Sequence, residues 1–155
     1  MPSPDDDVVA KLLGRKPQGA YKVVVRDRNG VPVVIENSPL LDDGTPMPTT
    51  YWLLTGEIHY RVSQLESEGG VDQAEQEIGL DAIAAAHDAY RTTRDANIDA
   101  AHTGVTPSGG VGGTRVGVKC LHAHMAWWLA GGDDPVGEWT AVRLGISRPV
   151  NGVVT

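Results

Sequence analysis

The sequence has little of what marks several familiar classes of protein. Its 155 residues include one cysteine, Cys120, so neither an internal disulfide nor a Cys-x-x-Cys zinc motif can form. A single free cysteine is typical of a protein from a reducing compartment. Lysine and arginine number 13 against 20 aspartates and glutamates, which gives a formal net charge of −7. Because broad binding to nucleic acids and to anionic membranes needs a basic surface, we expect neither as a partner.

Long apolar runs are missing as well. No segment approaches the roughly 20 apolar residues of a membrane-spanning helix, since even residues 125–130 lie between His124 and Gly131. The first residues are acidic and no apolar stretch follows them, so we expect no secretory signal and a soluble, cytoplasmic protein. No complete nucleophile, acid–base or cofactor motif occurs either. The sequence therefore leaves open whether the protein is an enzyme and whether it uses a cofactor.

What is present fits one ordinary globular domain. Hydrophobic residues make up 41% of the chain and charged residues 21%, and a domain of this length buries about 70% of the surface of its unfolded chain. We predict a single domain over residues 1–146 and a flexible tail at 147–155. Within the domain, the many glycines of residues 103–117 predict a loop that is flexible in isolation.

The strand signals lie in the first third of the chain. Two runs rich in β-branched residues, 20–26 and 31–36, flank Asn29-Gly30, a strong hairpin signal because both residues tolerate positive φ. Residues 51–54 have a similar composition and predict a third strand. Pro32 places the second strand at an edge of the sheet, because proline cannot donate a ladder hydrogen bond.

Helical patterns fill most of the remainder. Apolar residues at helical spacing predict helices at about 57–68, from 71 to 102 with a break at Gly79, at 118–130, and after residue 134. With a short helix near the N-terminus, they predict an α+β fold. In this fold a small antiparallel sheet, formed by the hairpin and a third strand, packs against a cluster of four to five helices. The candidate N-caps are Thr55, Asp81 and Asp134.

The long helix is predicted to leave the core in its second half. Arg94 and Asn97 interrupt its apolar face there. We therefore interpret His87, Arg91 and Asp95 as positions at the rim of the core or in solvent.

Reactive side chains concentrate in residues 115–124. On a strand, Cys120, His122 and His124 would face one side and could bind one metal ion. On the predicted helix, Cys120 and His124 lie about 40° apart while His122 points to the opposite face, which excludes a three-ligand site. Cys120 and His124 are thus the candidate metal ligands, with a thiol beside its base or a structural, apolar cysteine as alternatives. Further ligands would come from other histidines, such as His59, His87 or His102.

The same helix is a candidate anion site, because a glycine-rich loop leads into its first turn. Free N–H groups, the positive end of the helix dipole and nearby cations favour a phosphate or a carboxylate. The segment is not a P-loop, since Gly117 is followed by Val118 rather than by Lys-Ser or Lys-Thr. The candidate anion-binding residues are Arg115, Lys119 and His122, and the alternative is an ordinary linker between helices.

Three blocks of the sequence resemble a known family in the same order. They are DGTPMPTTYWL at 43–53, VSQLE at 62–66, and KCLH at 119–122 followed by LAGGDDPVG at 129–137. They are similar to bacterial, mainly actinobacterial, proteins called domain of unknown function 501. The resemblance covers most of the chain but implies no activity, substrate or catalytic residue. Genes of that family often neighbour those of a septum-formation initiator-like protein and an exopolyphosphatase-type phosphatase, which implies a link to cell division or phosphate metabolism.

Two functions of different kinds follow as hypotheses. The first is a non-catalytic binding or adaptor protein with a protein partner, linked to cell division. An exposed patch of any of the four tryptophans would favour this role, and core packing is the alternative. The second is a small enzyme or sensor that binds a phosphorylated small molecule or a metal ion around Lys119-Cys120-Leu121-His122. Convergence of Lys119, His122 and His124 on a concave pocket would favour this second role.

Overall fold

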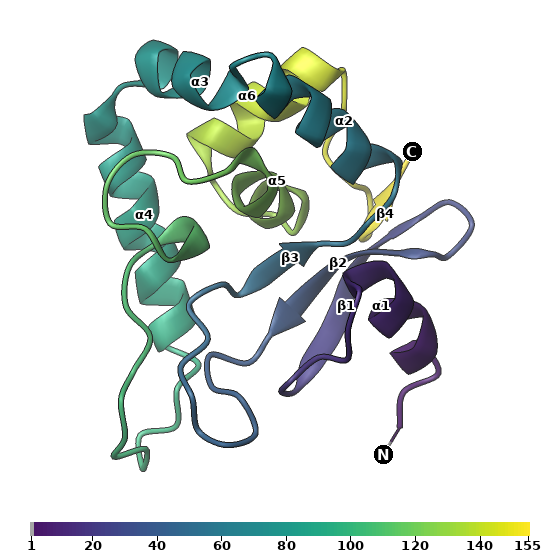
Figure 1. Cartoon of the computed structure of the whole chain (residues 1–155), viewed down its shortest axis with the longest axis vertical. Coiled ribbons are helices and arrows are strands. Elements are labelled where there is room, and N and C mark those ends of the chain that lie inside the picture. Colours follow the sequence, from purple (N-terminus) through teal and green to yellow (C-terminus); the bar gives the residue numbers. More distant parts are fainter. Residues whose placement is uncertain (1) are drawn as a thin grey trace.

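The computed structural model describes residues 2–155 and has a small sheet with helices packed on its faces (Figure 1). The strand order is β3-β2-β1-β4, and β1, β2 and β3 pair antiparallel as predicted. The prediction of an α+β fold is confirmed. The strands are β1 (Tyr21–Asp27), β2 (Pro32–Asn37), β3 (Tyr51–Leu53) and β4 (Val153–Val154).

Six α-helices and one 3-10 turn accompany the sheet in residues 2–155. In Figure 1, α5 lies among the other helices and beside β3, against which it packs directly. No helix in this part of the chain is long and apolar enough to cross a lipid bilayer. The helices are α1 (Asp6–Leu13), α2 (Glu57–Ser67), α3 (Gly70–Ile78), α4 (Leu80–Asp95), α5 (Leu121–Leu129) and α6 (Pro135–Leu144), and the turn is η1 (Val111–Gly113).

Each face of the sheet has its own apolar core. On one face, α1 packs Val9 against Ile35 and Leu54. On the other face, Val34 joins the main core, to which α5 contributes Met125. Val34 and Ile35 are neighbours in β2 and point in opposite directions, as the two-residue period of a strand requires. Full burial of one such side chain stabilises the fold by about 1.5–3 kcal/mol, so both layers hold the sheet in place.

The C-terminal segment completes the sheet, which corrects the prediction of a flexible tail at 147–155. Strand β4 pairs in parallel with Arg26 and Asp27 of β1. Strand β2 lies between β1 and β3 and is an inner strand, so the prediction that Pro32 marks an edge is wrong. Pro32 stands at the first position of β2, outside the residues that pair with β3, so its missing N–H removes no bond to that strand.

Only one of the three predicted N-cap residues caps its helix. The carboxylate of Asp134 accepts hydrogen bonds from two backbone N–H groups in the first turn of α6, as predicted. At α2 and α4 the predictions are wrong, because Gly56 and Gly79 occupy the N-cap positions instead of Thr55 and Asp81. At Gly79 the backbone has φ 88°, a left-handed angle that glycine adopts more readily than other residues.

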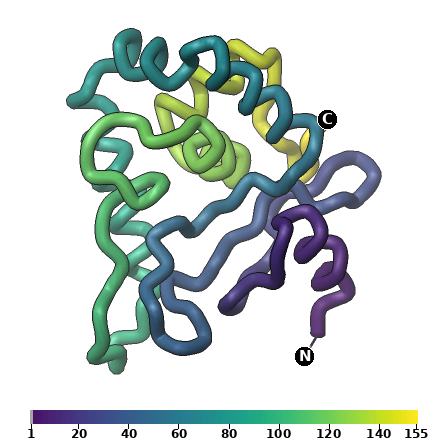
Figure 2. Tube along the Cα trace, in the orientation of Figure 1, coloured from purple at the N-terminus to yellow at the C-terminus, as the bar shows by residue number. Residues whose placement is uncertain are grey.

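The glycine-rich loop at 103–117 is packed along α4 rather than extending freely (Figure 2). Arg94 holds it, since its guanidinium donates to the carbonyl oxygens of Gly109 at 2.9 Å, Pro48 at 3.1 Å and Pro107 at 3.4 Å. The Arg94 side chain is only 1% exposed. The prediction that this end of α4 leaves the core is therefore wrong for Arg94, whose donors are satisfied by carbonyl groups of distant segments.

His87 is also buried and holds the end of the same loop. Its Nδ1 accepts from the N–H group of Val111 at 3.0 Å, and its Nε2 donates to the carbonyl oxygen of Gly117 at 2.7 Å. Gly110 allows this close approach, because a Cβ there would lie 2.5 Å from the Cβ of His87. The rim interpretation is wrong for His87, whereas Arg91 is exposed as predicted. Both His87 nitrogens are engaged, so this histidine has no free ligand atom.

Candidate metal centre

The first residue of α5 decides which of the reactive side chains at 115–124 lie close together. The helix begins at Leu121, later than predicted, and Cys120 is its N-cap with extended backbone angles of φ −152° and ψ 155°. The side chain of Cys120 therefore does not follow the helical spacing that paired it with His124. Instead, the ligand atoms of Glu66, Cys120 and His122 all lie within 4.8 Å of one another. The predicted separation of Cys120 from His122 is wrong for this reason.

Glu66 reaches this group from α2. His59, Ser63 and Glu66 stand at positions i, i+4 and i+7 and share one face of that helix. Glu66 Oε2 accepts the N–H group of Leu121 at 2.7 Å, which satisfies one of the free donors at the start of α5. The other oxygen, Oε1, lies 3.2 Å from Nδ1 of His122. No local sequence pattern marks Ser63 or Glu66 as functional, because only the fold places α2 against α5.

The second nitrogen of His122 has a partner too. Its Nε2 lies 3.0 Å from Oγ of Ser63, which in turn lies 3.0 Å from the carbonyl oxygen of His59. A hydroxyl carries one proton, so Ser63 donates either to His122 or to His59. Two tautomers of His122 fit these contacts. In one, Nδ1–H donates to Glu66 Oε1 and Ser63 donates to Nε2; in the other, Nε2–H donates to Ser63 and Ser63 donates to the carbonyl oxygen of His59. A metal ion would select the second tautomer, in which Nδ1 presents a lone pair toward the position shared with Glu66.

Burial sets the protonation of two groups at this site. It raises the pKa of the Cys120 thiol, while the backbone N–H group of Ala123 acts in the opposite direction. Burial also lowers the pKa of His59, and the neighbouring His122 lowers it further. At neutral pH His59 is therefore uncharged and Cys120 keeps its proton. A bound cation would stabilise the thiolate and so lower the pKa of Cys120.

The group is accessible to a small ion. The side chains of His122 and Glu66 are 21% and 24% exposed, and Cys120 is partly buried. The rings of His59 and His122 lie against each other with centroids 4.3 Å apart. A small cation can therefore reach these atoms without opening the apolar core.

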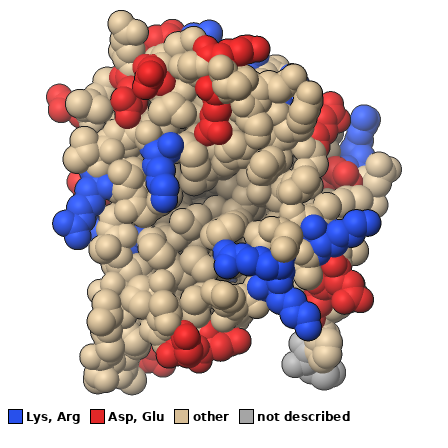
Figure 3. All heavy atoms as spheres, viewed as in Figure 1, with Lys and Arg blue, Asp and Glu red and all other residues tan. Residues whose placement is uncertain are grey.

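The side chains of the predicted anion site do not come together. The Lys119 ammonium donates to the carbonyl oxygen of Gly112 at 3.2 Å, Arg115 is exposed, and His122 faces α2. Within residues 2–155, no hydrogen bond or ion pair joins these three side chains. On the face of the molecule shown in Figure 3, lysines and arginines are interspersed with acidic side chains instead of forming one basic patch.

Carboxylates of the chain itself occupy the N–H groups that an anion would use. Val118 N–H donates to Oε1 of Glu75 at 2.6 Å, and Leu121 N–H donates to Oε2 of Glu66 at 2.7 Å. These two carboxylates provide the negative charge that the start of a helix favours. A phosphate would have to displace them.

His124 lies in the core, and the structure groups Cys120 with Glu66 and His122 instead of with His124 as in the predicted Cys120–His124 pair. Nδ1 of His124 donates to Oδ2 of Asp134 at 2.6 Å, and the two side chains are 1% and 0% exposed. Because Asp134 also caps α6, this buried pair joins α5 to α6. His102 is distant from any such role, since its Nε2 contacts the carbonyl oxygen of Val105 within its own loop.

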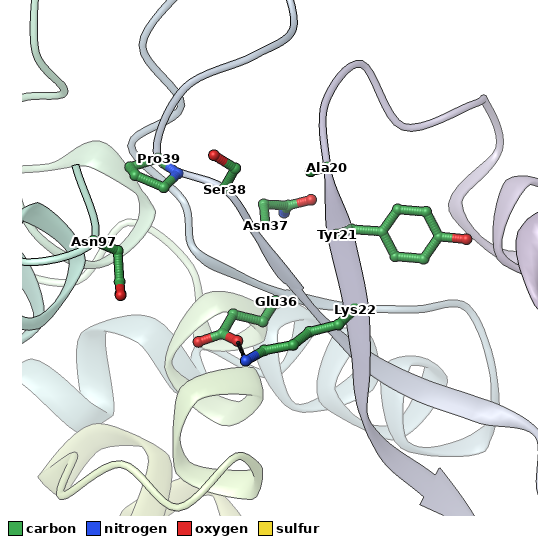
Figure 4. Close-up of a pocket in the computed structure, with 8 residues that line it drawn as sticks. All are labelled: Ala20, Tyr21, Lys22, Glu36, Asn37, Ser38, Pro39 and Asn97. Carbon is green, nitrogen blue, oxygen red and sulfur yellow. Dashed lines mark ion pairs between the residues drawn. The ribbon is translucent and has the colours of Figure 1, made fainter. Parts of the chain in front are cut away.

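Five surface cavities of the described chain are lined by other residues. The one in Figure 4 has a volume of about 310 Å³ and lies between the start of β1 and the end of β2, with Asn97 on a third side. Lys22 and Glu36 form an ion pair of 2.8 Å at this cavity, and the Tyr21 ring points away from them. These two charges neutralise each other and leave none free for a ligand. Lys119, His122 and His124 do not line any of these five cavities, so the convergence that would favour an enzyme or sensor is not found there.

The tryptophans pack in the core. Trp127 and Trp128 are buried, and Trp52 and Trp139 are partly buried against the apolar clusters. The core-packing interpretation of these side chains is therefore confirmed.

A match to a family model now identifies the relatives of this chain. The model described as a protein of unknown function, DUF501, matches residues 23–142. The chain belongs to the DUF501 family. Glu66, Cys120 and His122 of the candidate metal centre, and the neighbouring His59, lie within the DUF501 match. Searches of curated proteins and of solved structures found no significant match.

Proposed function

We propose that this DUF501 protein binds one divalent ion of the zinc class through Glu66 Oε1, Cys120 Sγ and His122 Nδ1. The observation that carries the proposal is the presence of these three ligand types within 4.8 Å of one another. A thiolate, an imidazole and a carboxylate together suit Zn²⁺ and similar transition metals, whereas Mg²⁺ and Ca²⁺ prefer oxygen ligands alone.

The bonds around the ligands support the proposal. Glu66 is fixed by its hydrogen bond from Leu121, and His122 is fixed by Ser63. Partners of this kind orient the ligands of metal sites and fix the tautomer of a ligating histidine. In the tautomer that frees Nδ1, the proton on His122 Nε2 goes to Ser63 and the hydroxyl proton goes to the carbonyl of His59. The ligand atoms that remain free thus point to one place.

The expected role of the ion follows from the elements that it would join. Glu66 belongs to α2, and Cys120 ends the loop that packs along α4. A bound ion would fasten Cys120, at the start of α5, to Glu66 of α2. Metal occupancy would then control the contact between these two helices. This favours a metal-responsive binding protein. An adaptor role, a protein partner and a link to cell division remain predictions.

A serine hydrolase is the second candidate, favoured by a single observation. Ser63, His122 and Glu66 form a chain of contacts at 3.0 and 3.2 Å, in the order of a nucleophile, a base and an orienting carboxylate. A fluorophosphonate probe tests it, since labelling that is lost in Ser63→Ala would support an acyl-transfer enzyme. We favour the metal because the second candidate gives no role to Cys120 and because the five cavities lie elsewhere.

Native mass spectrometry of protein purified without an affinity tag, loaded with zinc and then desalted, tests the proposal. We expect one zinc ion per chain in the wild type and none in Cys120→Ser, with unchanged circular dichroism in both. Wild-type protein that stays metal-free under these conditions would overturn the proposal. A second sample incubated with inorganic phosphate tests the predicted anion site in the same instrument.

A further inference from the structure

We infer that His59 is the fourth ligand of the proposed centre, so that a bound zinc-class ion is held by four protein groups and retains no water. This inference rests on the proposed function and extends it from three ligands to a closed site. It assigns the ion a structural or sensory role, because a catalytic zinc site keeps one position open for water or substrate.

His59 lies on α2 beside the proposed centre. His59 and Glu66 share one face of α2, which packs against α5 at the end where His122 and the N-cap Cys120 stand. The His59 ring already touches the ring of His122, with centroids 4.3 Å apart and planes inclined by 43°. Two imidazoles that bind one ion at about 2.0–2.1 Å are neighbours, so this contact puts His59 beside the centre.

The ring nitrogens of His59 are free to bind an ion. Within residues 2–155, neither ring nitrogen of His59 has a hydrogen-bond partner. The other three histidines outside the centre are committed elsewhere: His87 to two backbone groups, His124 to Asp134, and His102 to its own loop. Among the five histidines, only His59 lies beside the centre with a ring that makes no hydrogen bond in the described residues.

The movement required is a rotation of the His59 side chain. His59 lies outside the set of atoms within 4.8 Å, so its ring must turn toward the ion when the ion binds. The side chain is partly exposed, and the His59 ring can open away from its ring contact with His122 while it stays beside that ring. Because neither ring nitrogen of His59 has a hydrogen-bond partner in the described residues, this rotation breaks no hydrogen bond of the His59 ring.

Visible absorption of the cobalt-substituted protein tests the inference. In the wild type we expect a thiolate-to-cobalt charge-transfer band together with the strong d–d absorption of a tetrahedral ion. His59→Ala should keep the charge-transfer band, lose most of the d–d intensity as water enters, and bind cobalt at least roughly tenfold more weakly. Added imidazole should restore the tetrahedral spectrum by filling the vacant position. His102→Ala, which removes a histidine from a distant loop, is the matched control and should behave as wild type.

The outcomes separate this inference from the proposed function. If His59→Ala, and equally His59→Asn as a second variant, retain the wild-type spectrum and affinity, the fourth position holds water and the inference is overturned. If the wild type itself shows no charge-transfer band with cobalt, the proposed function fails, and the inference fails with it. Circular dichroism of each variant confirms that the comparison is made between folded proteins.

Discussion

The backbone N–H group of Leu121 donates to Glu66 Oε2 at 2.7 Å and thereby joins the first turn of α5 to α2. The same carboxylate turns its other oxygen toward His122. Glu66 thus has two tasks, one in the fold and one at the proposed centre. Because the tasks use different oxygens, a substitution can separate them.

Glu66→Gln is predicted to weaken zinc binding at least roughly tenfold and to change stability little. The amide oxygen of glutamine can still accept the Leu121 N–H group, but the charged ligand oxygen is lost. Competition for zinc with a chromogenic chelator measures the affinity. Glu68→Gln, an exposed residue just beyond the same helix, is the control. Equal affinities of Glu66→Gln and wild type would remove Glu66 from the centre.

Zinc is predicted to stabilise the wild-type protein against heat. An ion that binds only the folded chain adds about 2.7 kcal/mol at a concentration one hundred times its Kd. For a domain of this size, this corresponds to a rise in Tm of roughly 5–10 °C. Differential scanning calorimetry with and without zinc measures the shift, and a chelator should reverse it. In Cys120→Ser the two melting curves should coincide, and a full shift in that variant would contradict the account.

Arg94→Met is predicted to destabilise the fold by about 3 kcal/mol, because three backbone carbonyl groups in two distant segments lose a charged donor. The midpoint of urea unfolding measures the loss. Arg91→Met on the exposed side of the same helix should change the midpoint little, since Arg91 pairs only with exposed Asp88. Similar losses in the two variants would mean that the contacts of Arg94 contribute no special stability.

The elements with strong local signals are those that the sequence predicted. Alternating β-branched residues around Asn29-Gly30 gave the hairpin, and Asp134 gave the start of α6. The glycine-rich loop was misjudged because its composition indicates flexibility, whereas Arg94 and His87 hold it through contacts between residues far apart in the chain. No local pattern reports such contacts.

The candidate site was predicted in part for a similar reason. Cys120 and His122 were both singled out, but a helix start placed a few residues too early put them on opposite faces. One residue in extended conformation at position 120 reverses that conclusion. Ser63 and Glu66 look like ordinary polar positions of α2, and only the packing of α2 on α5 gives them a role. The pairing of His124 with Asp134 likewise depends on the packing of α5 on α6.

His124→Asn is predicted to keep full zinc binding while it lowers stability, because His124 belongs to the buried pair with Asp134 and not to the centre. Loss of a buried hydrogen bond to a carboxylate costs about 1.5–3 kcal/mol. Zinc content and the urea midpoint are measured on the same preparation. Loss of zinc from a folded His124→Asn would restore the Cys120–His124 pair that the sequence suggested.

X-ray absorption at the zinc edge of the loaded wild-type protein tests the central claim most directly, because it identifies the atoms bound to the ion. We predict one sulfur at about 2.3 Å and nitrogen or oxygen ligands at about 2.0–2.2 Å, including the scattering of imidazole. The sulfur should vanish in Cys120→Ser. A first shell of oxygen and nitrogen without sulfur in the wild type would contradict the account.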